Sequence, residues 1–160
     1  MSNKYSLPYD IRMECIAYVR GYPRRVRAYN AAREEVLEAS GYAMSGMPHS
    51  PPGNNGIAER KAERLATIEN WPETKKMRAV EYAMENVGRD IANENVRRKL
   101  VWAIMRNCDS QKQYPIEMIS PAGISPRTFR RRKDKFLWLI AQNAKIIENV
   151  APNHVSDGVK

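Results

Sequence analysis

The chain has 160 residues, 42% of them hydrophobic, which is enough to bury the core of one domain or of two small ones. Its 27 Lys and Arg exceed its 18 Asp and Glu, and the net charge of +9 favours a polyanionic partner. Because the sequence has no apolar run of membrane-spanning length and no secretion signal in its first residues, we expect a cytoplasmic protein without a membrane partner.

The residue types that usually carry catalysis or bind metals are sparse. Cys15 and Cys108 are far apart and lack a CxxC pattern, so we interpret both as core thiols in a reducing compartment. His49 lies in a Pro-rich stretch and His154 near the end of the chain, neither in a recognisable catalytic arrangement, and the glycine patterns that bind phosphates are absent from the sequence. We therefore expect no catalytic residue, no metal site and no cofactor.

The first 43 residues have the apolar spacing of helices. Apolar residues recur in steps of about four before the Gly21–Pro23 segment, and a similar rhythm resumes after it. Since Gly and Pro are the strongest helix breakers, we predict a helical hairpin within residues 1–43 that turns at this segment. Residues 44–56 are rich in Gly, Pro, Ser and Asn and are predicted to form a loop. The apolar residues of the hairpin are Leu7, Ile11, Cys15 and Val19, then Val26, Tyr29, Ala32, Val36 and Leu37.

Residues 57–148 are predicted to form a further helical domain, followed by a flexible tail at residues 149–160. Three amphipathic segments of this domain place apolar side chains along one face. No β alternation appears in the sequence, so we predict an all-α fold. The apolar residues are Ile57, Ala58, Leu65 and Ile68; Met77, Val80, Met84, Val87 and Ile91; and Val96, Leu100, Ile104 and Cys108.

The stretch GISPRTFRRRKDKFLWLIA, which begins at Gly123, joins a basic block to an apolar one. Gly123 tolerates the positive φ of a tight turn, Ser125 is a good N-cap, and Pro126 suits the first helical position. We therefore predict a helix that begins at Ser125 or Pro126. Residues 136–140 are apolar around the whole circumference, so other helices or a second subunit are expected to enclose them.

A helix-turn-helix consists of a short helix, a turn that often contains Gly, and a second helix that enters the DNA major groove. Arginines in the first turns of the second helix are suited to that groove. The segment of about residues 115–147 has these parts. Arginine forks bind guanine edges or phosphates, hydroxyl groups at a helix start bind phosphate oxygens, and lysines suit the charged backbone. The predicted contacts with double-stranded DNA are Ser125, Arg127, Thr128, Arg130, Arg131, Lys133 and Lys135.

The same stretch resembles the C-terminal region of the RinA/ArpU-type phage transcriptional regulators, whose helix-turn-helix is similar to the promoter-binding one of sigma factors. The segments YVRGYPRRVRAYNAAREEVL and AERKAERLATIE are similar to the N-terminal layout of that family. The resemblance implies a phage or prophage late-gene activator that acts at a promoter with RNA polymerase in a bacterial host cell. It also implies a structural brace between the two helices of the motif, formed by Glu117 and Arg132.

Other functions fit the same residues. A phage small-terminase-like packaging protein would share the basic helix-turn-helix but form a ring, whereas an activator would be a monomer or a homodimer. A protein-interaction module would carry the basic helix without binding DNA, and a nuclease would need a carboxylate and histidine cluster that the sequence lacks. For the activator, we expect the N-terminal helices to dimerise or to contact RNA polymerase.

Overall fold

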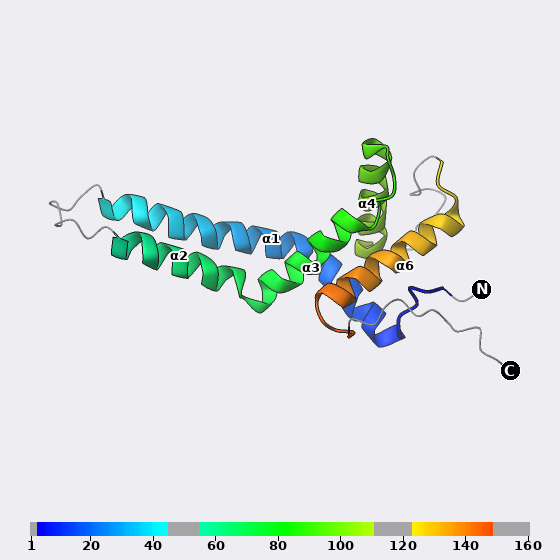
Figure 1. The fold of residues 1–160 in the computed structure, drawn as a ribbon, viewed down its shortest axis with the longest axis horizontal. Coiled ribbons are helices and arrows are strands. Elements are labelled where there is room, and N and C mark those ends of the chain that lie inside the picture. Colours follow the sequence, from blue (N-terminus) through cyan, green and yellow to red (C-terminus); the bar gives the residue numbers. More distant parts are fainter. Residues whose placement is uncertain (1–2, 45–54, 111–122, 149–160) are drawn as a thin grey trace. The chain divides into compact units, whose positions relative to one another are not determined.

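The computed structural model describes residues 3–44, 55–110 and 123–148. Within these ranges the chain is helical and has no β-strand, which confirms the all-α prediction. The backbone divides into two compact units, which we call the helix-pair unit (Tyr22–Met77) and the α6 unit (Met1–Gly21 with Arg78–Lys160). The helices, labelled in Figure 1, are α1 (Tyr9–Met44), α2 (Asn55–Glu69), α3 (Pro72–Asn86), α4 (Glu94–Asp109) and α6 (Pro126–Asn143).

The first helix, α1, passes through Gly21 and Pro23 without a break, so the predicted hairpin turn at this segment is wrong. A proline inside a helix removes one backbone donor and costs about 3 kcal/mol, but burial of apolar residues on both sides outweighs such a local preference. Val19 is buried before the segment, and Tyr29 and Val36 are buried after it. The packing of these residues therefore keeps the helix continuous despite the low helix propensity of Gly21 and Pro23.

The helix-pair unit contains a hairpin, but its two arms are the second half of α1 and α2, which lie side by side (Figure 1). At the end of α2 the buried Thr74 hydroxyl donates a hydrogen bond of 2.6 Å to the Ile68 carbonyl, which fixes the short connection to α3. The core consists of Tyr29, Val36, Ile68 and Met77, with Tyr22, Val26, Ala32 and Leu65 packed against it.

Three sequence predictions concern residues that the structure does not describe. The predicted loop of residues 44–56 overlaps the last residue of α1 and the first two of α2, and its middle, residues 45–54, is outside the described ranges. The predicted tail at 149–160 and the first helix of the predicted helix-turn-helix, before Gly123, are outside them as well.

The α6 unit has the larger core, in which α4 packs against α6. The side chain of Asn93 caps α4 by accepting hydrogen bonds from the backbone N–H groups of Asn95 and Val96, at 3.0 and 3.3 Å. The fully buried larger side chains of this unit are Cys15, Val19, Val80, Val87, Leu100, Ile104, Cys108, Phe129, Phe136, Leu137 and Ile140.

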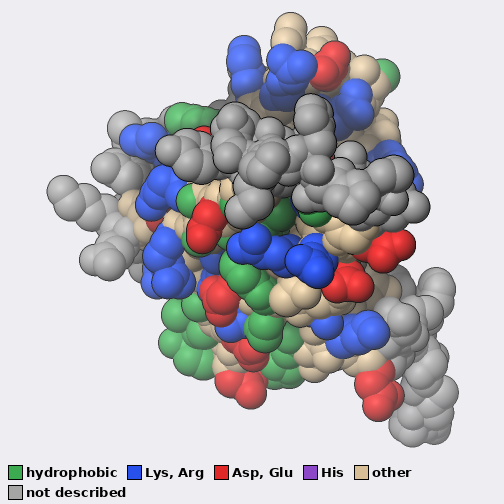
Figure 2. Space-filling view, turned by 90° about the vertical axis from the view of Figure 1, so that its left-hand side faces the viewer, with side chains coloured by type: hydrophobic (Ala, Val, Ile, Leu, Met, Phe, Trp, Pro, Cys, Tyr) green, Lys and Arg blue, Asp and Glu red, His purple; other side chains and the backbone are tan. Residues whose placement is uncertain are grey.

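Charged side chains of both signs are exposed, for example Glu94 and Arg98. On the face shown in Figure 2, basic side chains are interspersed with acidic and hydrophobic ones, so the net charge of +9 does not appear there as one uniform basic patch. Among the described helices, none combines the length and the apolar character that crossing a membrane requires.

Candidate nucleic-acid interface

The start of α6 has the geometry that the sequence predicts. Gly123 has a φ of +88°, and the helix begins at Pro126 with Ser125 as its N-cap. The Ser125 Oγ accepts a hydrogen bond of 3.2 Å from the Thr128 N–H and donates one of 3.0 Å to the Thr128 Oγ1. Since the Ser125 hydroxyl is engaged in capping, Thr128 is the better donor to a phosphate oxygen near this helix end.

The arginines of the first turns are exposed, whereas the second half of α6 is buried. Arg127, Arg130 and Arg131 face solvent, but Phe129 between them is completely buried and anchors the helix. Residues 136–140 are all buried, which confirms the expectation that this half is enclosed. α6 therefore presents a cationic surface from a rigidly held backbone.

The side chain of Trp138, which is only 8% exposed, is covered by the segment that precedes α1. The ring of Tyr5 meets it edge to face, with centroids 5.5 Å apart and an angle of 61° between the planes. Asn3 Nδ2 donates a hydrogen bond of 2.5 Å to Asp134 Oδ2, and Arg12 forms a 2.5 Å ion pair with Asp134 Oδ1. Residues 3–5 thus pack on the side of α6 that carries Asp134 and Trp138.

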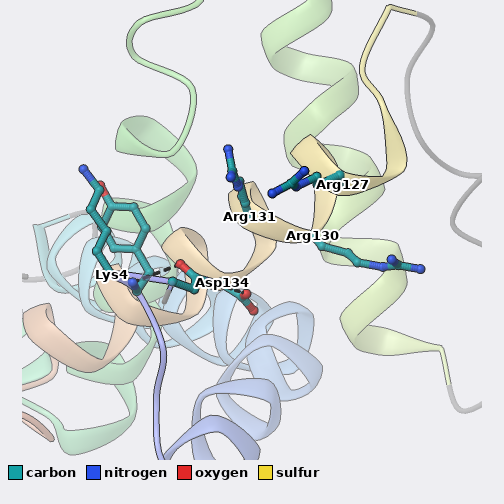
Figure 3. A pocket seen from close by; sticks show the side chains of 7 residues that line it. Lys4, Arg127, Arg130, Arg131 and Asp134 are labelled. Carbon is teal, nitrogen blue, oxygen red and sulfur yellow. Dashed lines mark hydrogen bonds between the residues drawn. The ribbon is translucent and has the colours of Figure 1, made fainter. Parts of the chain in front are cut away.

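Between this segment and the first turns of α6 lies an open cleft of about 450 Å³. Figure 3 shows Arg127 and Arg131 close together beside the cleft, whereas the Arg130 guanidinium points away from them. This divergence follows from the helical period, which places Arg127 and Arg131 one turn apart on the same side and Arg130 about 100° from Arg131. The described residues that line the cleft are Asn3, Lys4, Tyr5, Arg127, Arg130, Arg131 and Asp134.

Arg132 differs from the arginines before it because it is bound to the turn that follows α3. Its two terminal nitrogens lie 2.5 and 2.6 Å from the Asp90 carboxylate oxygens, and one of them donates a 3.0 Å hydrogen bond to the Val87 carbonyl. These hydrogen bonds lower the pKa of Asp90 to about 2 and raise the pKa of Arg132. Arg132 thus ties α6 to the turn that follows α3, and its observed partner, Asp90, is not the one that the resemblance implies. The implied partner Glu117 is outside the described residues.

The two lysines of the predicted interface are half-buried. Burial lowers the pKa of Lys133, with a smaller contribution from Arg12 and an opposing one from Cys108. Lys133 is therefore less suited to a DNA backbone contact than the sequence predicts. Lys135 lies near enough to Asp90 to make a small contribution to the lowered pKa of that carboxyl group. Part of the positive charge of Lys135 is therefore offset by Asp90.

Both cysteines are free and buried, as expected for core thiols. Burial raises the pKa of Cys15 to about 12 and also raises that of Cys108, so neither is a thiolate at neutral pH. In the part of the chain that the structure describes, no three His, Cys, Asp or Glu side chains are grouped as metal ligands would be. His49 and His154 are outside that part.

The position of residues 3–5 beside α6 was not predicted from the sequence. The opening sequence has no periodicity and one lysine, and nothing in it indicates that the segment folds back onto a helix more than a hundred residues away. The pairing of Arg132 with Asp90 was also missed, because it joins residues 42 positions apart. The comparisons do not add a functional assignment: no family model, curated protein or solved structure matches the chain.

Proposed function

We propose that the chain is a sequence-specific DNA-binding transcriptional regulator in which α6 reads the major groove. The observation that carries the proposal is the pair of exposed arginines, Arg127 and Arg131, on one side of a capped and well-anchored helix start. Two guanidinium forks held in this way match the O6 and N7 acceptors of guanine, and a bidentate contact of this kind discriminates between bases by about 1–3 kcal/mol.

The start of α6 supplies the contacts that position such a helix on the duplex. The Thr128 hydroxyl and the positive end of the helix dipole suit a phosphate oxygen. Arg130, which points to a different side from Arg131, suits a phosphate of the neighbouring strand segment rather than a base. In this proposal Ser125 caps the helix, and Lys133 and Lys135 add to the local positive charge.

The resemblance to the RinA/ArpU-type regulators makes a phage or prophage late-gene activator in a bacterial cytoplasm the specific form of this proposal. Such an activator would act at a promoter with RNA polymerase. The small-terminase-like alternative would use the same helix, so the two are separated by particle size. Sedimentation of the full chain as a monomer or dimer supports the activator, whereas a ring of many subunits supports packaging.

The proposal is tested with the full chain on the DNA that flanks its own gene. Footprinting would locate a specific site, and fluorescence anisotropy would then compare that site with a random duplex at several salt concentrations. We expect Arg127→Ala and Arg131→Ala each to cost about 1–3 kcal/mol on the specific site and less on the random duplex. Arg24→Ala, which removes an exposed arginine of the helix-pair unit, is the control and should bind like the parent.

Two results would contradict the proposal. If either arginine variant loses the same affinity on both duplexes, that arginine contacts phosphate and does not read a base. If the parent chain binds neither duplex with a steep decrease in affinity as salt rises, the chain is not a DNA-binding protein, and the interaction-module alternative holds.

A further inference from the structure

The segment Asn3–Tyr5 is ordered by its own hydrogen bonds as well as by α6. The Asn3 side-chain oxygen accepts a 3.1 Å hydrogen bond from the Tyr5 N–H, and the Asn3 carbonyl accepts one of 3.0 Å from the Ser6 N–H. The other end of the Asn3 side chain binds Asp134, and the Tyr5 ring rests against Trp138. The segment is therefore a fixed wall of the cleft.

Lys4 lies between these two anchors and is exposed. Its ammonium group lies 5.0 Å from the centroid of the Tyr5 ring, a cation–π contact that gives the flexible side chain a preferred direction. Figure 3 shows Lys4 on one side of the cleft and Arg131 and Arg127 on the other. A positive charge thus lines each side of the same hollow.

The carboxylate of Asp134 does not neutralise this arrangement. Among the described residues that line the cleft it is the one acidic side chain, and one of its oxygens is bound by Arg12 while the other accepts from Asn3. An anion between Lys4 and Arg131 would therefore meet cations on two sides, and the carboxylate nearby already has its charge paired with Arg12. The chemistry that fits the hollow is a phosphate.

We infer that Lys4, held by Asn3 and Tyr5, contacts a backbone phosphate of the duplex that α6 reads. This inference rests on the proposed function and adds a residue far away in sequence to the same interface. Such a contact releases one counterion from the DNA and carries no sequence information, so it should act equally on all duplexes.

The test uses the full chain and measures affinity for the specific and the random duplex as a function of salt. We expect Lys4→Gln to lower affinity about five- to tenfold at ~0.1 M salt on both duplexes, and to reduce the slope of log affinity against log salt by about 0.9. Lys75→Gln removes an exposed lysine of the helix-pair unit and should leave affinity and slope unchanged.

A second variant tests whether the segment must be held against α6. Tyr5→Ala keeps Lys4 but removes the ring that directs its ammonium group and covers Trp138. It should cause the same loss of salt slope as Lys4→Gln, and the double variant should lose no more than either single one. If the two losses add fully, Lys4 contacts the duplex without being held by Tyr5. That result would contradict the inference that the segment Asn3–Tyr5 positions Lys4.

The outcomes separate this inference from the proposed function. If the parent binds DNA and Lys4→Gln binds with equal affinity and slope, the inference is wrong and the proposed function stands. If the parent binds neither duplex, both are wrong. Inorganic phosphate, added at constant ionic strength, should not displace the duplex. If it does so in the parent but not in Lys4→Gln, the cleft is a site for free phosphate and the inference fails.

Discussion

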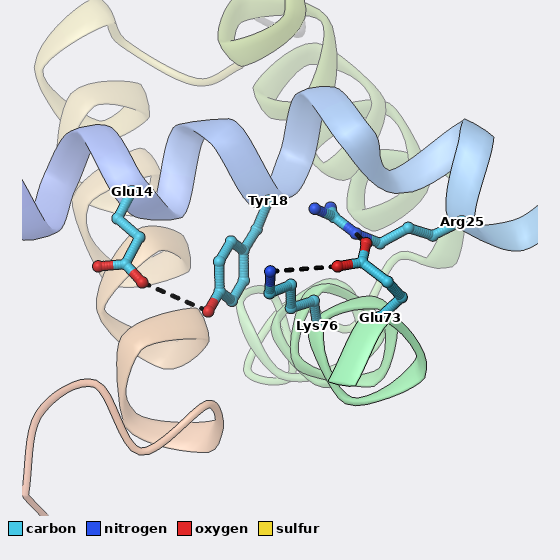
Figure 4. Close-up of polar contacts among 5 residues, drawn as sticks. All are labelled: Glu14, Tyr18, Arg25, Glu73 and Lys76. Atoms are coloured by element: carbon cyan, nitrogen blue, oxygen red, sulfur yellow. Dashed lines mark hydrogen bonds and ion pairs between the residues drawn. The ribbon is translucent and has the colours of Figure 1, made fainter. Parts of the chain in front are cut away.

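The two units of this chain differ in how their charge is arranged. The helix-pair unit has nine Lys and Arg and seven Asp and Glu, whereas the rest of the chain has 18 and 11. In the helix-pair unit, Glu73 lies 2.7 Å from Arg25 and 3.2 Å from Lys76, as Figure 4 shows. Opposite charges nearly balance in the helix-pair unit, and most of the net charge of +9 belongs to the rest of the chain.

The hollows of the two units differ in the same way. The helix-pair unit has a hollow of about 200 Å³ whose lining is largely uncharged, with Glu35 and Arg64 of opposite sign. The cleft beside α6 has four cations and one engaged carboxylate. Net charge alone therefore does not identify an anion-binding surface. The proposed site is distinguished by a set of cations whose one acidic neighbour is already paired.

The largest expected effect concerns the anchoring half of α6. Trp138→Ala should lower the free energy of unfolding by about 3–5 kcal/mol, because it removes a buried aromatic side chain that packs against Tyr5. Thermal unfolding followed by circular dichroism would measure the loss. Arg131→Ala, from the exposed half of the same helix, is the control and should unfold like the parent.

If Trp138→Ala unfolds at the same temperature as the parent at every concentration, the division of α6 into a buried and a reading half is wrong. In that case the cations of α6 would not be held on a rigid support.

A smaller effect is expected at Pro23, which lies in α1 just inside the helix-pair unit. Pro23→Ala restores a backbone donor inside the helix and loses little packing, because Pro23 is exposed. We expect stabilisation by about 1–2 kcal/mol, the gain being reduced by the greater freedom of the unfolded chain. Chemical unfolding would measure it.

The control introduces a proline instead of removing one, at an exposed position of the same helix. Ala28→Pro should lower the free energy of unfolding by about 3 kcal/mol. Destabilisation by Pro23→Ala would contradict the explanation given for the continuity of α1, since the proline would then fit its position better than an ordinary helix former does.

The smallest effect is a pH dependence at the ion pair of Arg132 with Asp90. Because the pKa of Asp90 is lowered to about 2 in the folded chain, the ion pair stabilises fully above its ordinary value near 4 and is lost as the pH falls from about 4 to about 2. The Asp90 side chain is 61% exposed, so Asp90→Asn should cost less than about 1 kcal/mol at neutral pH.

The stability difference between Asp90→Asn and the parent should therefore be constant above pH 5 and disappear in acid. Glu73→Gln provides the comparison in the helix-pair unit, because hydrogen bonds from Arg25 and Lys76 lower the pKa of Glu73 as well. A difference for Asp90→Asn that stays the same down to pH 2 would show that the carboxylate does not stabilise the fold through its charge.

Local sequence signals predicted α6 well. The turn at Gly123, the cap at Ser125 and the burial of residues 136–140 depend on neighbouring residues and on the helical period, which are both visible in the sequence. The wrong turn at Gly21–Pro23 has the opposite cause. There a local breaker was overruled by packing against residues distant in sequence, which periodicity cannot reveal.

The candidate site was predicted only in part for the same reason. The sequence places Arg127 and Arg131 together because they belong to one helix, whereas the position of Lys4 beside the same cleft depends on contacts across more than a hundred residues. The three consecutive arginines also look equivalent in the sequence. Only the position of Asp90 distinguishes Arg132 as an ion-paired side chain from Arg131 as an exposed one.

The ion pair between Arg12 and Asp134 has a consequence for the attraction that a polyanion feels at a distance. Residues 127–135 carry six cations, one of which is matched by Asp90, and the single carboxylate of Asp134. Arg12 supplies, from α1, the charge that this carboxylate would remove. Cations therefore outnumber unpaired carboxylates around the cleft, and a positive surface of this kind raises the association rate of a polyanion by about 10- to 1,000-fold at low ionic strength. Arg12, which is not among the described residues that line the cleft, would thus contribute to the association rate of a polyanion if one binds there.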